Sequence, residues 1–218
     1  MPESESELRE FLETLKPKND VPFSLVVNVL SGKEVIPVTQ SKEDEKLLKD
    51  LKKAIIKAGK KASEDGLFSA RPNEAGNKVE PFLRDALNEI GLDADIPKNS
   101  LGNKQSTGYP DIYLKDSFGR HNYVEVKTHE YTVDVTKGGL RAFYMSPPKP
   151  NKSKIIYDAR HFIVAYGLEK TRRDGKTCFV PKNWKIVSIH DMKVNIKYEF
   201  NTDSAGMYNN SILDTGNI

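Results

Sequence analysis

The chain has 218 residues, of which 37% are hydrophobic and 30% are charged, with a net charge of +3. This mixture predicts one folded domain with a buried core and excludes a chain that is disordered throughout. The single cysteine, Cys178, excludes an intramolecular disulfide and a zinc site built from several thiolates, and it is typical of a reducing compartment.

The first predicted element is a short surface helix over residues 2–16, where apolar residues recur every three or four positions until Pro17. This segment is acidic, whereas a secretion signal begins with basic residues. The sequence also has no run of about 20 apolar residues, the length needed to cross a bilayer. We therefore expect a cytoplasmic protein without a membrane-spanning segment.

Residues 23–30 and 34–38 are rich in β-branched side chains and flank Ser31-Gly32-Lys33, a pattern that predicts a β-hairpin. Residues 43–62 then follow a helical period, with an apolar stripe and lysines on the remaining surface. Residues 64–77 are rich in Gly, Asn, Asp and Ser and predict a loop. In the family resemblance described below, residues 1–75 would be an N-terminal addition to the core of the fold.

A second helix is predicted over residues 77–90, with Asn77 as its cap and Gly91 as its stop. Its apolar side is formed by Val79, Phe82, Leu83, Ala86, Leu87 and Ile90. A short strand over residues 92–96 and a polar, glycine-containing loop over residues 97–108 follow.

The most informative pattern is a hairpin of two strands, residues 109–115 and 122–128, joined by a five-residue turn. If Lys115 pairs with His121, the same register places Asp111 opposite Glu125. Alternation along the strands then puts Asp111, Glu125 and Lys127 on one face. The other face, which can join a core, carries Ile112, Leu114, Val124 and Val126.

Two carboxylates that face each other across a hairpin repel one another unless a cation neutralises them. Mg²⁺ prefers oxygen ligands and commonly uses one or two carboxylates together with substrate phosphate and water. Lys127 would reach the same phosphate or the attacking water. The alternative interpretation is an ordinary amphipathic hairpin whose exposed face happens to be charged.

After the hairpin, residues 136–154 contain Gly and Pro pairs and predict a long loop, followed by a buried strand over residues 161–168. Two more strands are predicted over residues 184–190 and 193–200, before a polar tail. Residues 137–185 hold 12 basic and 3 acidic side chains. Such a local excess favours a nucleic-acid partner, although a solvated lysine-rich surface has the same composition.

The combination of Pro110-Asp111 with Glu125-Val126-Lys127 resembles the PD-(D/E)xK nuclease superfamily over roughly residues 75–170. The resemblance implies an α/β fold with an αβββαβ core (residues 76–170), a mixed central sheet flanked by helices, and C-terminal strands and tail over residues 171–218. It implies that Asp111 and Glu125 bind Mg²⁺ and that Lys127 positions or activates water. The helix before the last core strand would have to come from residues 154–160 or from part of 136–144.

Members of the superfamily often carry one more acid on the first core helix, and Glu80 stands at that position. The same residue lies three positions after Asn77, which is also the spacing of a capping box. Further candidate DNA contacts precede the strand of Asp111 or lie in the long loop: Gln105, Ser106, Lys137, Arg141, Tyr144 and Lys149.

A chain of this length with additions at both ends, and without an ATP-binding loop, looks most like a type II restriction endonuclease that cuts double-stranded DNA at a specific sequence. This resemblance implies a homodimer on a palindromic site and a cognate DNA methyltransferase in the same restriction-modification system. Two alternatives remain open. One is a structure-specific repair or recombination nuclease of the same fold, and the other is a nucleic-acid-binding module that does not cleave.

Overall fold

The computed structural model describes residues 5–70, 72–134, 143–149 and 151–199. The chain divides into two compact units, one of residues 22–192 and a smaller one of residues 1–21 and 193–218. The smaller unit contains α1 (Glu5–Thr14) and a two-stranded sheet of β1 (Lys18–Pro22) and β8 (Lys193–Ile196). The predicted N-terminal helix is therefore confirmed, and the last strand is shorter than the predicted residues 193–200.

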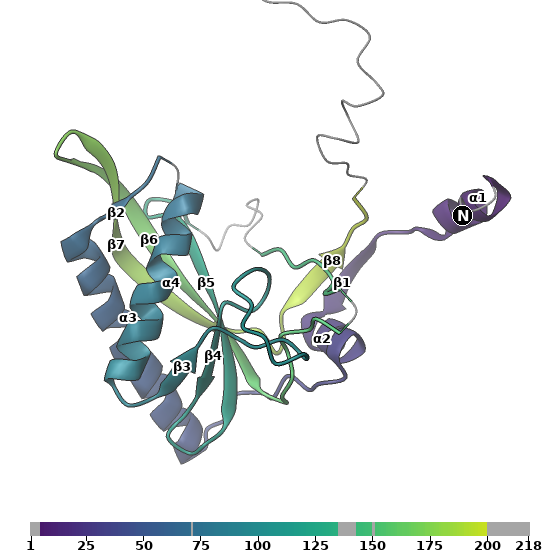
Figure 1. Cartoon of the computed structure of the whole chain (residues 1–218), viewed down its shortest axis with the longest axis horizontal. Coiled ribbons are helices and arrows are strands. Elements are labelled where there is room, and N and C mark those ends of the chain that lie inside the picture. The colour runs from purple at the N-terminus through teal and green to yellow at the C-terminus, as the bar shows by residue number, and fades with distance from the viewer. Residues whose placement is uncertain (1–4, 71, 135–142, 150, 200–218) are drawn as a thin grey trace, which may run out of the picture. The chain divides into compact units, whose positions relative to one another are not determined.

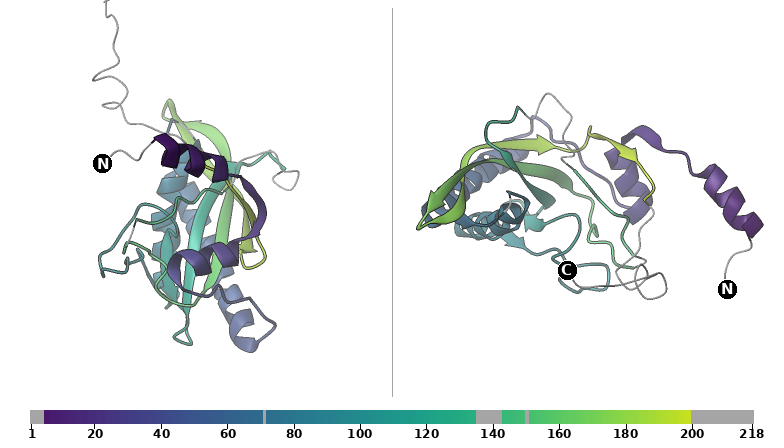
Figure 2. Two further views of the ribbon diagram at one scale, coloured as in Figure 1. Left: turned by 90° about the vertical axis from the view of Figure 1, so that its right-hand side faces the viewer. Right: turned by 90° about the horizontal axis from the view of Figure 1, so that it is seen from above.

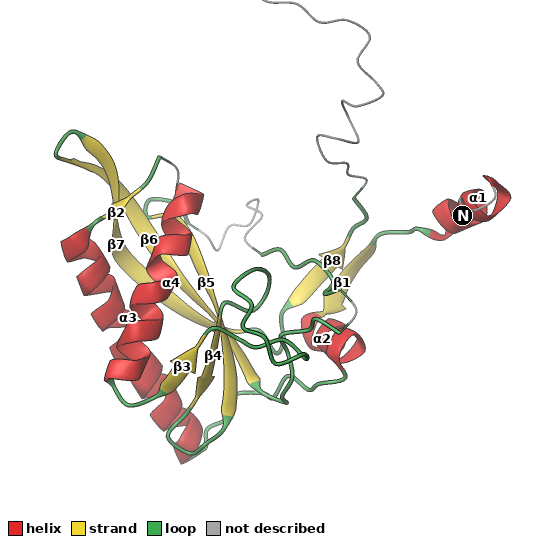
Figure 3. Cartoon of the chain, in the orientation of Figure 1, coloured by secondary structure: helices red, strands yellow, loops and turns green. Residues whose placement is uncertain are grey.

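The larger unit contains a six-stranded sheet with the order β2-β7-β6-β5-β4-β3. Its elements are α2 (Phe23–Ser31), α3 (Lys42–Asp65), β2 (Leu67–Phe68), α4 (Pro72–Glu89), β3 (Asp93–Asp95), β4 (Ile112–Lys115), β5 (His121–Glu130), β6 (Arg160–Arg173) and β7 (Lys176–Ser188). Strands β5 and β6 run parallel, and the other neighbouring pairs are antiparallel. The predicted mixed sheet with packed helices is confirmed (Figure 3).

Helices α3 and α4 lie side by side on one face of this sheet (Figures 1 and 2). Helix α3 begins where the Ser41 hydroxyl accepts a hydrogen bond from the Asp44 backbone N–H. The core forms between the two helices and the sheet, and it includes the predicted inward-facing residues of the hairpin. Among the described helices, none has both the length and the apolar character needed to span a bilayer.

The predicted hairpin over residues 23–38 is wrong, because residues 23–31 form the helix α2. Phe23 and Val27, four residues apart, are both buried and give the segment one apolar helical side. Gly32 ends the helix with a φ of 67° and donates its N–H to the Asn28 carbonyl. Val35, in the segment expected to be the second strand, makes only an isolated bridge to Ala159.

The predicted loop over residues 64–77 is also partly wrong, because α4 already begins at Pro72. Proline suits a first helical position, where its missing N–H leaves no bond unmade. Asn77 therefore lies inside the helix and does not cap it, which also removes the capping-box interpretation of Glu80. The stop at Gly91, with a φ of 86°, agrees with the prediction.

The helix expected between the third and last core strands is absent from the described residues of that connection, 131–134, 143–149 and 151–159. The proposed helical stretch 154–160 instead leads as loop and turn into β6 (Figure 3). Strand β6 extends beyond the predicted residues 161–168 because it pairs with β7 along its length, through a turn at Asp174 and Gly175. The predicted strand 184–190 is the second half of β7.

Candidate active site

The register predicted for the central hairpin is confirmed, since Lys115 pairs with His121 and Ile112 with Val124. One residue before β4, the Asp111 backbone N–H donates to the Val124 carbonyl at 3.2 Å, which continues the pairing to the start of the hairpin. Ile112 and Val124 are fully buried against the helices. Alternation therefore places Asp111 beside Glu125 on the opposite face of the sheet.

The Asp111 carboxylate is held by the strand it faces, because its Oδ2 atom accepts a hydrogen bond of 2.7 Å from the Val126 N–H. Burial raises the pKa of Asp111, and the Val126 hydrogen bond together with the charges of Lys127 and Lys154 only partly offsets this. Asp111 is thus a fixed carboxylate in a poorly solvated position.

Glu125 is more deeply buried, with only 4% of its surface exposed. Its Oε1 atom accepts a hydrogen bond from Lys127 Nζ at 2.6 Å, whereas its Oε2 atom is buried and receives no donor from the described residues. Burial and the neighbouring charge of Asp111 raise the pKa of Glu125 to about 7 in spite of Lys127. The charge and hydrogen bond of Lys127 therefore offset only part of the effect of burial on Glu125.

Glu80 on α4 lies close enough to this pair for the charge of Asp111 to raise its pKa, after the larger effect of burial. Its carboxylate forms an ion pair of 3.1 Å with Arg84, one helical turn further along. The structure thus brings Glu80 to the edge of the acid cluster, and its part in a nuclease site stays a prediction.

Lys154 is a member of the cluster that sequence reasoning did not select. Its side chain is buried, with 3% exposed, and Nζ donates to the carbonyl of Gly108 at 2.5 Å. The charges of Asp111, Glu125 and Glu80 all act on it and oppose the lowering of its pKa by burial. Lys154 therefore supplies a second internal cation, and it also fixes the loop immediately before Asp111.

The remaining candidates are dispersed. Gln105 braces its own loop, donating to the Thr107 carbonyl and accepting from the Asn99 side chain. Ser106 is exposed on that loop. Tyr144 is exposed and contacts Ser146, and Lys149 lies at the surface. Lys137 and Arg141 fall outside the described residues.

Aromatic rings form one wall beside the cluster. The ring of Phe143 lies 5.9 Å from Lys127 Nζ and packs edge-to-face against Tyr109. The Tyr109 hydroxyl lies 2.6 Å from Nδ1 of His161, whose pKa burial lowers to about 3. On the neighbouring strand Ala165 stands beside Lys127 in register, so no large side chain of β6 covers the lysine there.

Asp111 and Glu125 fit a divalent cation, because they are two neighbouring carboxylates, one half-buried and one buried, and Glu125 Oε2 accepts no hydrogen bond from the described residues. Within the described part of the chain, no group of three or more His, Cys, Asp or Glu side chains forms an all-protein cage. Two carboxylates are sufficient for Mg²⁺, which keeps several waters and takes further oxygen ligands from a substrate phosphate.

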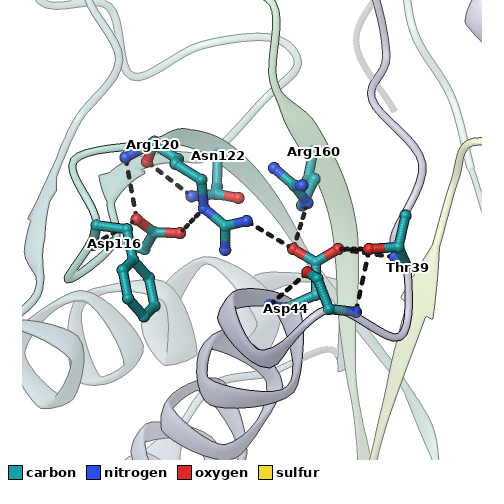
Figure 4. A network of polar contacts seen from close by, with 8 residues as sticks. Thr39, Asp44, Asp116, Arg120, Asn122 and Arg160 are labelled. Carbon is teal, nitrogen blue, oxygen red and sulfur yellow. Dashed lines mark hydrogen bonds and ion pairs between the residues drawn. The ribbon is translucent and has the colours of Figure 1, made fainter.

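A second charge cluster anchors the turn of the same hairpin (Figure 4). Arg120 bridges Asp116 at 2.7 Å and Asp44 at 2.8 Å, and Arg160 also pairs with Asp44 at 2.8 Å. Burial acts to raise the pKa of Asp44, but Thr39 hydrogen bonds and the two arginines hold it below its usual value. The start of α3 is thereby tied to β5 and β6.

Two comparisons with known proteins concern the family of the chain. The sequence model of the type II restriction enzyme MjaV family matches residues 16–211. Type II restriction enzyme MjaV of Methanocaldococcus jannaschii is 36% identical over 225 aligned positions, which cover 97% of this chain and 94% of that protein.

Proposed function

Because the chain belongs to the type II restriction enzyme MjaV family, we propose that it is a Mg²⁺-dependent endonuclease that hydrolyses phosphodiester bonds of double-stranded DNA at a specific sequence. The observation that carries the chemistry is the pair of half-buried Asp111 and buried Glu125, with Lys127 donating to Glu125 at 2.6 Å. A cation held by these two acids would lie beside the ammonium group that Lys127 extends to Glu125.

In this proposal Asp111 and Glu125 hold the metal, and Glu80 adds negative charge from α4. When bound, Mg²⁺ would supply positive charge to the scissile phosphate and to the attacking water. The hydrogen bond from Val126 fixes the Asp111 carboxylate, so its orientation does not depend on the ligand.

Lys127 has two functions in the proposed reaction. Its ammonium group keeps the Glu125 Oε1 atom oriented, and because its partner in register on β6 is the small Ala165, a phosphate oxygen would approach it from that side. The water oxygen attacks phosphorus in line with the 3′ oxygen. The P–O3′ bond breaks, the water loses one proton, and the 3′ oxygen gains one, which leaves a 5′-phosphate and a 3′-hydroxyl.

The aromatic wall would limit the access of bulk water to these charges. Phe143 packs against Tyr109 and faces Lys127, and Tyr109 is hydrogen-bonded to the neutral His161. Charge interactions strengthen where water is excluded, so the ammonium group of Lys127 would act more strongly on a developing negative charge.

The test is digestion of a sequenced plasmid with and without MgCl₂, followed by mapping of the ends. We expect discrete fragments with 5′-phosphates only when the metal is present. Asp111→Asn keeps an acceptor for the Val126 N–H but loses the charge, and it should bind duplex DNA without cutting it. Asp93→Asn, an exposed acid on β3, is the matched control and should cut like the wild type.

Other outcomes would support the alternatives. Selective cleavage of junctions, flaps or mismatches would support a structure-specific nuclease. Binding of DNA by the wild type without cleavage under any metal condition would support a non-cleaving module. A homodimer is expected if the cut site is palindromic, and protection of that site by a cognate methyltransferase would place the enzyme in a restriction-modification system.

A further inference from the structure

A groove opens on the surface of the larger unit, close to the acid cluster but separate from it. Its volume is about 680 Å³, and its lining residues come from three parts of the chain that are distant in sequence, residues 30–33, 98–102, and 148–149 with 151–157. The first is the end of α2 and the turn after it, and the other two belong to the loops on either side of the hairpin. None of them belongs to the catalytic hairpin itself.

The charge of this groove has one sign. Lys33, Lys98 and Lys149 line it, one from each segment, and no aspartate or glutamate is among its described lining residues. Lys98 and Lys149 are exposed, and Lys33 is half-buried. Lysine is a point-charge binder of phosphate, so three lysines without a carboxylate favour a polyanion.

The two loops of the groove are fixed to each other before any ligand binds. The Ser100 N–H donates to the Ser153 carbonyl at 2.9 Å. The Asn99 side chain is buried and accepts from the N–H groups of Leu101 and Asn103 at 3.0 and 3.2 Å. A preformed surface loses little conformational entropy on binding, which favours association.

The groove is also joined to the acid cluster by the chain itself. Ser153 and Ile155 line the groove, while Lys154 between them points away from it and donates to Gly108, two residues before Pro110. A strand of DNA whose scissile phosphate lies at Asp111 and Glu125 would therefore have neighbouring phosphates within reach of this surface.

We propose that this lysine groove binds the phosphate backbone of double-stranded DNA beside the scissile phosphate, and so supplies sequence-independent affinity. The inference rests on the proposed nuclease function, which it extends from the site of cutting to the surface that grips the substrate. Backbone contacts of this kind position a duplex and carry no base specificity.

The test compares two triple variants of the full chain that lose the same charge. Lys33→Gln/Lys98→Gln/Lys149→Gln removes the groove lysines, and Lys52→Gln/Lys53→Gln/Lys60→Gln removes exposed lysines of α3. Binding to a 30-base-pair duplex of arbitrary sequence is measured by fluorescence anisotropy in EDTA over a series of NaCl concentrations. The slope of log K against log[salt] is negative, and each lost phosphate contact lowers its magnitude by about 0.9.

We expect the groove variant to lower the magnitude of this slope by about 2 to 3, because about three contacts are lost. Its binding at 0.1 M salt should be at least ~10-fold weaker than that of the wild type. The α3 variant should stay within about twofold of the wild type, because it changes net charge without changing the groove. Equal effects of the two variants would overturn the proposal. If the groove variant lost affinity for single-stranded DNA but not for the duplex, the proposal that the groove binds double-stranded DNA would be overturned.

Folding is checked by circular dichroism. If the triple glutamine variant unfolds, the three single variants replace it, each with an expected loss of about 0.9 in slope, and the corresponding arginine triple should retain binding. Failure of this inference is distinguishable from failure of the proposed function. A wild type that cuts DNA while its groove variant binds normally overturns only the groove, whereas a wild type that neither binds nor cuts duplex DNA overturns both.

Discussion

The hairpin has a charge cluster at each end, and the pKa values of the acids shift in opposite directions in the two clusters. At its turn, the Asp44 and Asp116 carboxylates are matched by Arg120 and Arg160, and the pKa of Asp44 is held low. At its open end, burial raises the pKa of Asp111, and burial together with the charge of Asp111 raises the pKa of Glu125. The difference teaches that hydrogen bonds and two arginines keep the pKa of a buried carboxylate low, whereas the lysines at the open end offset burial only in part. We infer that the turn cluster serves rigidity and that, in the proposed nuclease, the acid pair serves reactivity.

The largest expected effect on this comparison comes from Asp44→Ala, which leaves two arginines without their buried partner. Removing one member of a buried ion pair costs about 3–5 kcal/mol, and thermal unfolding should show a correspondingly large fall in Tm. Asp65→Ala, an exposed acid at the end of the same helix, is the control and should change little. Similar Tm values for the two variants would remove the structural role assigned to the turn cluster.

The second effect breaks the other cluster. Lys127→Met should lower the single-turnover cleavage rate by roughly 10²–10³-fold, or about 3–4 kcal/mol, because the proposed reaction loses its ammonium group. Lys115→Met, at the exposed end of β4, should cleave normally. We expect both variants to fold. A normal cleavage rate for Lys127→Met would show that the ammonium group of Lys127 has no part in the reaction.

The third prediction uses pH in the absence of metal. Because the pKa of Glu125 rises from 4.5 to about 7 on folding, its contribution to stability is complete below pH 4.5 and is lost as the pH rises through 7. At 1.36 kcal/mol per unit this amounts to about 3 kcal/mol, measurable by urea unfolding in EDTA between pH 5 and 8. Glu125→Gln should flatten the curve in this range, and an unchanged curve would contradict the assignment.

Asp44 should give the opposite dependence. Its lowered pKa means that its stabilisation is present above the unfolded value near 4 and disappears as the pH falls below it. Acid unfolding should therefore begin at the turn cluster, whereas loss of stability toward pH 8 should arise at the acid pair.

The smallest expected effect concerns Lys154. Lys154→Met should destabilise the metal-free protein by about 1–3 kcal/mol, because the Gly108 carbonyl loses its donor and three acids lose an internal cation. Addition of MgCl₂ should raise the Tm of this variant by more than it raises the Tm of the wild type, because the metal would supply part of the missing positive charge. Lys152→Met, exposed in the same segment, is the control. An equal rise in Tm with Mg²⁺ in all three proteins would argue against Lys154 as an internal cation of the acid cluster.

Much of the fold near the site could be predicted because its determinants are local. The alternation of Ile112, Leu114, Val124 and Val126 fixed the buried face, and the turn fixed the register that brings Asp111 to Glu125. The helical periods of α3 and the second half of α4 were equally clear. The error at residues 23–31 arose because Val and Leu suit a buried helix as well as a strand, and only the burial of Phe23 and Val27 on one side decides between them.

The sequence by itself determined the acid pair, its lysine and the hairpin that presents them, because side-chain alternation and turn length act over about 15 residues. Only the tertiary structure decided which distant charges meet. Lys154 is one of many lysines in the printed sequence, yet it is buried beside Gly108, and Arg120 reaches an aspartate 76 positions away. Such contacts depend on how distant segments pack together in the fold, and the sequence periodicity of one segment carries no information about that packing.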